Sequence, residues 1–266
     1  MRYHVITLFP SSFDSYLNES ILKRAIADKK ISVDFYNPRD FGPAGEKSKG
    51  YKSDGKKLSK GATLSYSDRR VDDKPYGGGP GMVIEALPVI YAIESAIAKI
   101  KKYSKANQKV KTIAKAKSSA KTKAGSKPKV KIIFFSPSGV QFDQGVAKVQ
   151  AKKYTDIIFV CGRYEGIDAR IKKAFKMEDI SVGPFVLTGG ELPAMILIDA
   201  ISRHVPGVLG HIESLEESRV ASPDVYTRPE AIIFKGKKYK VPAVLLSGNH
   251  RLIEEWRAGR INNSAK

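Results

Sequence analysis

Two glycine-rich turns, each placed directly after a short apolar run, constrain the fold of this chain more than any other feature. CGRYEGIDAR (161–170) follows the apolar run 157–161, and SVGPFVLTGG (181–190) follows the run 180–182. Both runs are typical of β-strands that stop at a glycine, where a ligand can approach the backbone without meeting a Cβ. Two such loops at the carboxyl edge of a parallel sheet predict a binding crevice. Neither is a dinucleotide fingerprint or a P-loop.

Expected strands and helices alternate along most of the chain. Apolar runs predict strands at residues 3–9, 31–36, 130–135, 157–161 and 180–182. Helical spacing predicts helices from Pro10 to about Asp28, at 85–100 and at 144–152, the last with Asp143 as its N-cap. Alternation of this kind predicts an α/β fold with a parallel sheet covered by helices on both faces.

The segment after Gly190 predicts a helix that is apolar on every side. Asp199 is the only charge in its interior. A helix that is apolar all round must be buried on all faces. A homodimer is the favoured explanation, and a central helix covered by its own chain is the alternative.

The net charge of +20 is concentrated in two segments. Residues 99–131 contain 13 Lys and no acid, and residues 44–70 carry eight basic against three acidic side chains. The rest of the chain is therefore close to neutral. These segments are interpreted as solvated insertions, disordered on their own, or as electrostatic tethers for a polyanion such as RNA.

Composition also predicts the domain organisation of the protein and the cellular compartment in which it works. We expect a main domain over 1–209, a flexible polar linker over 210–223 and a small domain over 224–266, with strands at 231–234 and 239–246 and a helix at 251–257. Cys161 is the only cysteine, which fits a reducing cytoplasm and a small buried side chain better than a reactive thiol. No apolar run is long enough to span a membrane, and the four histidines lack metal-ligand spacing.

A series of short motifs follows in a fixed order along the chain. They are ITLFP at 6–10, PRDF at 38–41, VDDKPYGGGPGM at 71–82, SPSG at 136–139, CGRYEGID at 161–168, SVGPFVLTGGELPAM at 181–195, SRHVPGVLG at 202–210, YTRPE at 226–230 and VLLSGNH at 244–250. In this order the chain resembles the knotted tRNA (guanine-N1)-methyltransferases, the TrmD family. The resemblance covers most of residues 1–257 apart from the two basic segments.

The resemblance implies a SPOUT-type fold, in which a parallel sheet carries a deep trefoil knot that holds S-adenosyl-L-methionine (AdoMet). It also implies a homodimer with an active site shared between two subunits, and possible assistance by Mg²⁺. Phe185 stands where the family often has tyrosine. The positions that match the family's cofactor loops are Ser136, Pro137, Gly162, Tyr164, Glu165, Gly166, Val182, Gly183, Pro184, Phe185, Val186, Leu187, Gly189 and Gly190.

Methylation of guanine at N1 needs a base for the N1 proton and a donor for the charge that develops at O6. By resemblance, Arg203 is the candidate donor and substrate contact, and Glu217 is the candidate base. Glu217 stands where the family's linker motif E-D-S has aspartate, because this chain reads Glu216-Glu217-Ser218. Glu216 and Asp224 stay open as alternative bases. The glycine run that includes Gly78 and Gly79 is a further candidate for substrate contact.

The resemblance therefore implies an AdoMet-dependent enzyme that methylates N1 of the guanosine at tRNA position 37, next to the anticodon, and so maintains the reading frame. The expected partner is the anticodon arm of tRNA, in the cytoplasm. Two alternatives are a SPOUT methyltransferase that acts on rRNA and a catalytically idle RNA-binding or ribosome-assembly protein. Family members usually continue beyond the segment around Trp256 with helices that help to grip tRNA, whereas only GRINNSAK follows here. The Lys-rich segment 99–131 is hypothesised to compensate.

Overall fold

The computed structural model describes residues 1–41, 70–116, 127–209 and 224–258, with side chains described up to Ala106 in the second range. The chain divides into two compact units, Met1–Val208 and Leu209–Lys266. The expected linker at 210–223, with Glu216 and Glu217, lies outside the described residues, as does most of the basic segment 44–70.

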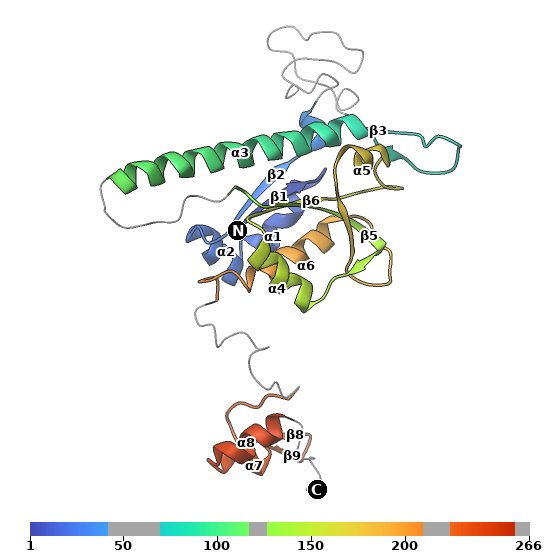
Figure 1. Ribbon diagram of the computed structural model, residues 1–266. Coiled ribbons are helices and arrows are strands. Elements are labelled where there is room, and N and C mark those ends of the chain that lie inside the picture. Colours follow the sequence, from blue (N-terminus) through green and yellow to red (C-terminus); the bar gives the residue numbers. More distant parts are fainter. Residues whose placement is uncertain (42–69, 117–126, 210–223, 259–266) are drawn as a thin grey trace. The chain divides into compact units, whose positions relative to one another are not determined.

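The first unit is built on a five-stranded sheet with the strand order β2-β1-β6-β5-β7 (Figure 1). Every neighbouring pair in it is parallel, so the carboxyl ends of all five strands meet at one edge. The prediction of an α/β fold with a parallel sheet is confirmed. The strands are β1 Arg2–Ile6, β2 Ser32–Tyr36, β5 Val130–Gln141, β6 Asp156–Val160 and β7 Glu178–Ser181.

Helices cover both faces of this sheet (Figure 1). The long helix α3 (Ala86–Ala116) and the short α5 (Arg170–Ala174) pack on one face. The other face carries α6 (Glu191–Ser202), α4 (Gln144–Lys153), α2 (Ser20–Ala27), α1 (Asp14–Leu17) and the 3-10 turn η1 (Pro10–Phe13).

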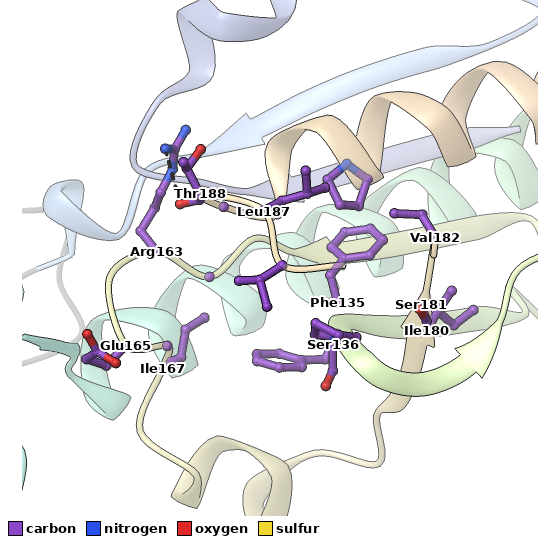
Figure 2. Close-up of a pocket in the computed structure, with 18 of the residues that line it drawn as sticks. Phe135, Ser136, Arg163, Glu165, Ile167, Ile180, Ser181, Val182, Leu187 and Thr188 are labelled. Atoms are coloured by element: carbon purple, nitrogen blue, oxygen red, sulfur yellow. Dashed lines mark hydrogen bonds between the residues drawn. The ribbon is translucent and has the colours of Figure 1, made fainter. Parts of the chain in front are cut away.

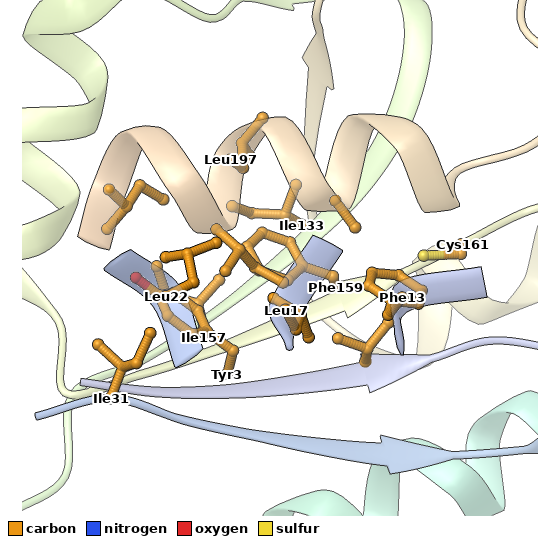
Figure 3. Close-up of a cluster of buried hydrophobic side chains, with 14 of the residues drawn as sticks. Tyr3, Phe13, Leu17, Leu22, Ile31, Ile133, Ile157, Phe159, Cys161 and Leu197 are labelled. Carbon is orange, nitrogen blue, oxygen red and sulfur yellow. The ribbon is translucent and has the colours of Figure 1, made fainter. Parts of the chain in front are cut away.

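Each face has its own hydrophobic core, because the central strands are buried on both sides. All five residues of β6 are buried. Figure 3 shows the core between α6 and the sheet, where Leu197 of the helix lies above Ile133 and Phe159 of the strands. Burying apolar surface at about 25 cal/mol per Å² is the main favourable term that fixes these layers.

Short elements connect the sheet to the glycine run. The 3-10 turn η2 (Pro38–Asp40) follows β2, and β3 (Asp72–Asp73) pairs antiparallel with β4 (Val83–Ile84). Residues 74–82 form the loop between β3 and β4. The antiparallel pairing of these two strands therefore places the glycine run at the tip of a hairpin, next to the first turn of α3.

Two sequence predictions in this unit need correction. The helix expected over 85–100, and expected to run into the Lys-rich segment, does so and continues to Ala116, because the Lys- and Ala-rich residues that follow are strong helix formers. The first half of the segment interpreted as disordered is therefore helical. The strand expected at 130–135 continues through the SPSG motif to Gln141, with a register shift between Phe135 and Val140.

The second unit begins with an antiparallel hairpin of β8 (Ala231–Phe234) and β9 (Lys237–Lys240). Its turn, Lys235-Gly236, has positive φ at both residues, as a two-residue hairpin turn requires. Trp256 is buried against Tyr226, with ring centres 6.1 Å apart. The helices are α7 (Ala243–Leu246) and α8 (His250–Arg257).

The prediction of a strand at 239–246 is wrong over most of its length. The strand ends at Lys240, and Ala243–Leu246 forms a helical turn instead. Pro242 explains the break, because it cannot donate to a strand ladder but suits the start of a helix.

A buried ionic cluster ties β1 to the amino end of β6. Asp156 is fully buried, and it accepts two hydrogen bonds from Arg2 at 2.7 and 2.8 Å and one from Thr155 at 2.7 Å. His4 Nε2 lies 3.3 Å from the same carboxylate. Burial alone would raise the pKa of Asp156, but the hydrogen bonds from His4, Arg2 and Thr155 outweigh it and lower the pKa to about 2.

Asp156→Asn is expected to reduce the free energy of unfolding by about 2 kcal/mol at neutral pH. The folded pKa lies below the unfolded value of 3.8. The carboxylate therefore stabilises the fold above about pH 4, and this stabilisation is lost as the pH falls towards about 2. Urea unfolding across this range measures the effect, and the variant should show a flatter pH dependence. If the free energy of unfolding of the variant depended on pH as steeply as that of the wild type, Asp156 would not be the group that causes this dependence.

Candidate functional site

A cavity of about 380 Å³ lies at the carboxyl edge of the sheet, where β6 and β7 end beside residues 134–137 of β5. Figure 2 shows its walls, with Phe135 and Ser136 coming from β5, Arg163 and Glu165 from the loop after β6, and Leu187 from the loop after β7. Its volume is within the range of roughly 300–1,000 Å³ that is usual for small-molecule sites. The crevice predicted from the two glycine-rich turns is present.

Nearly all of the residues assigned to the cofactor line this cavity. The exception is Pro184, which is not part of the wall. Sequence reasoning did not name several others that also line it, although most lie inside or beside the quoted motifs. The predicted residues in the wall are Ser136, Pro137, Gly162, Tyr164, Glu165, Gly166, Val182, Gly183, Phe185, Val186, Leu187, Gly189 and Gly190, and the additional ones are Phe134, Phe135, Arg163, Ile167, Ala169, Lys172, Ile180, Ser181, Thr188 and Pro193.

The two loops are joined by backbone contacts that need glycine. Gly190 N–H donates to Gly162 O at 3.0 Å, and Arg163 forms an isolated antiparallel bridge with Gly189. A Cβ on Gly190 would lie 2.6 Å from the Cα of Cys161, which is backbone that cannot move aside. Glycine at position 190 therefore lets α6 start directly against the end of β6.

A buried carboxylate sits behind the cavity wall at the start of α6. Glu191 is 2% exposed, and its Oε1 accepts a 2.7 Å hydrogen bond from the Thr7 hydroxyl. Its Oε2 lies 2.9 Å from Arg163 Nε in an ion pair. The Arg163 guanidinium also lies 4.7 Å from the centre of the Phe9 ring. These contacts hold the arginine side chain, and with it the loop after β6, in a fixed position.

The buried thiol beside this carboxylate is not a nucleophile. Cys161 is 3% exposed. Burial raises its pKa well above the ordinary value, and the negative charge of Glu191 raises it further. The thiol is therefore held in its protonated form at neutral pH, in agreement with its interpretation as a small buried side chain.

The loop after β6 is shaped by two left-handed residues. Tyr164 has a φ of 58°, which is uncommon for a side chain of this size, and Gly166 has a φ of 122°. The loop is held to the glycine-run hairpin, because Glu165 N–H donates to Met82 O and Ile84 N–H donates to Gly166 O, both at 3.0 Å. Strained residues of this kind cluster at ligand sites.

The glycine run stands beside the cavity but does not line it. Gly78 and Gly79, the predicted substrate contacts, have positive φ, and a Cβ on either would meet no atom within 4 Å. Tyr76 in the same loop is 99% exposed. The run therefore presents open backbone next to the cavity mouth.

Of the predicted catalytic residues, Arg203 is the one whose position in the first unit is described, and it does not line the cavity. Arg203 caps the carboxyl end of α6, whereas Pro193 near the other end of that helix lines the cavity. The two positions are ten residues apart, which corresponds to about 15 Å along the helix axis. Glu216 and Glu217 lie outside the described residues, and Asp224 belongs to the second unit.

Helix α6 is not buried on all faces in the single chain. Leu192 is 54% exposed and Ile196 is 48% exposed, whereas Ala194, Leu197, Ile198 and Ile201 are fully buried. The described part of the first unit therefore does not supply the full cover that the alternative of a central helix requires. Within the described residues of the first unit, Leu192 and Ile196 of α6 stay exposed next to the cavity.

No three His, Cys, Asp or Glu side chains among the described residues are grouped as a metal site requires. In the same part of the chain, no helix has both the length and the apolar character needed to cross a bilayer.

Fold and site together define an α/β protein with a small-molecule cavity between two glycine-rich loops at the end of a parallel sheet. The family model for tRNA (Guanine-1)-methyltransferase TrmD matches residues 1–56 and 107–265. A tRNA (guanine-N(1)-)-methyltransferase of Clostridioides difficile is 40% identical over 261 residues, which cover 97% of this chain and 90% of that protein.

Two further comparisons agree. A tRNA (guanine-N(1)-)-methyltransferase of Pseudoalteromonas atlantica is 37% identical over 259 residues, covering 96% of this chain and 78% of the relative. The crystal structure of a tRNA (m1G37) methyltransferase from Aquifex aeolicus matches with a TM-score of 0.64 and 33% identity, over 97% of this chain and 88% of that one. The chain belongs to the tRNA (guanine-N1)-methyltransferase, TrmD, family.

Proposed function

We propose that this protein transfers the methyl group of AdoMet to N1 of the guanosine at position 37 of tRNA. Its membership of the TrmD family over nearly the whole chain carries the proposal. The cavity between the loops at residues 162–169 and 182–190 supports it independently, because it offers a small-molecule site where the motifs predict one.

The cavity fits the chemistry of AdoMet. Its wall combines apolar side chains for a flat base, among them Phe135, Ile180 and Leu187, with glycine backbone from both loops. Polar main-chain groups at glycine can satisfy the edge of an adenine while apolar side chains pack against its faces. The knot that the family fold implies would thread these same loops, and we include it in the proposal.

The bound cofactor would supply an electrophilic methyl group, so that a bond forms between the methyl carbon and N1 as the bond to sulfur breaks. The N1 proton passes to a carboxylate, for which Glu217 is the proposed acceptor. Arg203 is the proposed donor to O6, where negative charge develops as the proton leaves. The glycine run would lie along the target nucleotide.

The proposed enzyme is a homodimer in which each active site takes residues from both chains. Arg203 is about 15 Å along α6 from the cavity wall, so a second copy offers a direct way to bring it to the methyl group. The exposed Leu192 and Ile196 support such an interface, because burying them removes apolar surface from water.

The product identifies the reaction. After incubation with AdoMet and an unmodified tRNA transcript, we expect mass spectrometry of the digested RNA to find 1-methylguanosine. Methylation found only in rRNA would favour the rRNA-modifying alternative. Binding of AdoMet and tRNA without any methylated nucleoside would favour an idle RNA-binding protein.

A further inference from the structure

We propose that the amino-end edge of the sheet, opposite the cavity, binds phosphates of the tRNA substrate at a distance from the anticodon loop. The basic edge, as we name it, comprises the exposed side chains of Lys101, Lys102, Lys105, Lys127 and Lys129. This inference rests on the proposed function, because it identifies how the same substrate is held.

Contacts in the fold place these lysines together. Lys129 O accepts from Thr155 N–H at 2.9 Å, which puts the start of β5 beside the start of β6. Tyr103 of α3 lies under Arg2, the first residue of β1, with the guanidinium carbon 5.5 Å from the ring centre. The stretch of α3 that carries Lys101, Lys102 and Lys105 therefore lies at the same edge of the sheet.

Acidic side chains do not neutralise the basic edge. Within the described ranges, its five lysines form no ion pair, and residues 99–131 contain no acid. The nearby carboxylates of Asp34, Asp156 and Glu178 are each paired with another cation. Asp28, at the end of α2, is exposed on the neighbouring turn. Exposed lysines that are not neutralised by acidic neighbours give this edge the positive charge that attracts a phosphate backbone.

The position of the basic edge sets the distance between the phosphates that it binds and the cavity. The cavity lies at the carboxyl ends of the strands, and the basic edge lies at their amino ends. A five-residue strand such as β6 spans about 16 Å. A phosphate at the basic edge therefore lies at least about 16 Å from a guanine at the cavity, and the proposal places it in the tRNA outside the anticodon stem-loop.

The test compares two RNAs and two matched variants of the full chain. Lys101→Glu/Lys102→Glu/Lys105→Glu reverses the charge with good helix formers, and Lys101→Arg/Lys102→Arg/Lys105→Arg keeps it. Affinity for full-length tRNA and for a short anticodon stem-loop is measured over a salt series, with AdoMet affinity as the check on folding.

The glutamate variant is expected to bind full-length tRNA at least about tenfold more weakly than the wild type. The slope of the logarithm of its binding constant against the logarithm of the salt concentration should be shallower by about 0.7 to 0.9 for each phosphate that the protein no longer neutralises. Its affinity for the stem-loop should be unchanged, and the arginine variant should bind both RNAs as the wild type does.

Unchanged binding of full-length tRNA by the glutamate variant would overturn the inference, and so would an equal loss of affinity for both RNAs. These outcomes leave the proposed function intact, provided that the wild type methylates the stem-loop or the tRNA. A wild type that neither binds nor methylates tRNA would overturn both proposals.

Discussion

Replacing Arg203 by alanine is expected to lower kcat for tRNA methylation by ~10²–10³, the usual effect of removing a donor that stabilises developing charge. The proposed guanidinium contact forms mainly as charge moves to O6, so the affinity for AdoMet should stay close to that of the wild type. Single-turnover methylation with saturating tRNA and AdoMet measures the effect.

The fold of the Arg203→Ala variant should be retained, because Arg203 caps α6 through its backbone N–H, which donates to Asp199 O at 3.2 Å. Arg203→Lys is the matched control, and it should lose less activity because the positive charge remains. Wild-type turnover by the alanine variant would remove Arg203 from the proposed mechanism.

Replacing Gly190 by alanine is expected to raise the Kd for AdoMet at least about tenfold. The new methyl group would lie 2.6 Å from the Cα of Cys161 and 3.2 Å from the N of Gly162, so the two loops would have to separate. Overpacking of this kind typically costs about 1–3 kcal/mol of stability. Calorimetric titration with AdoMet and a thermal unfolding curve measure the two effects.

Gly162→Ala is the matched control for Gly190→Ala, because Gly162 also lines the cavity. The nearest atom to its new Cβ would be Ile167 Cγ1 at 3.6 Å, an ordinary contact with a side chain. Its AdoMet affinity should change much less. Equal affinities for AdoMet in the two variants would contradict the view that the loops are held by close backbone packing at position 190.

The same two variants, Arg203→Ala and Gly190→Ala, test whether the active site is shared. A random mixture of the two chains contains mixed dimers, in which one of the two sites has an intact cavity and an intact Arg203. If subunits of the two variants exchange freely in equal amounts, about half of the dimers are mixed and half of their sites are intact. Such a mixture should therefore recover about a quarter of the wild-type activity. Activity no higher than that of the separate variants would place the whole site within one chain.

Short-range patterns in the sequence were sufficient to predict the elements that build the cavity. The runs before Gly162 and Gly183 became β6 and β7, and Asp143 caps α4 by accepting from Val146 N–H at 2.8 Å. These features depend on local propensity and on the alternation of apolar runs, which a single sequence records.

Contacts between distant residues were not predictable in this way. Thr7 and Glu191 are 184 positions apart, yet they share a 2.7 Å hydrogen bond behind the cavity. Both residues, and Arg163 between them in the chain, lie within motifs that were recognised. The motifs indicated that these positions matter, but only the fold shows that the three side chains hold one another.

The extent of α3 and the end of β9 show how propensity and apolar pattern can compete. The Lys- and Ala-rich residues after Ile100 lack an apolar stripe, which favoured disorder, but their high helix propensity continues a helix that is already nucleated and packed. After Lys240, the apolar residues favoured a strand, but Pro242 ends the ladder.

The central claim is tested most directly by methyl transfer from labelled AdoMet to two unmodified tRNA transcripts that differ only at the proposed target. One transcript carries guanosine at position 37, and the other carries adenosine there. We predict that label enters the guanosine transcript and is absent from the adenosine transcript. Equal labelling of the two transcripts, or no labelling of either by a protein that binds both AdoMet and tRNA, would contradict the proposed function.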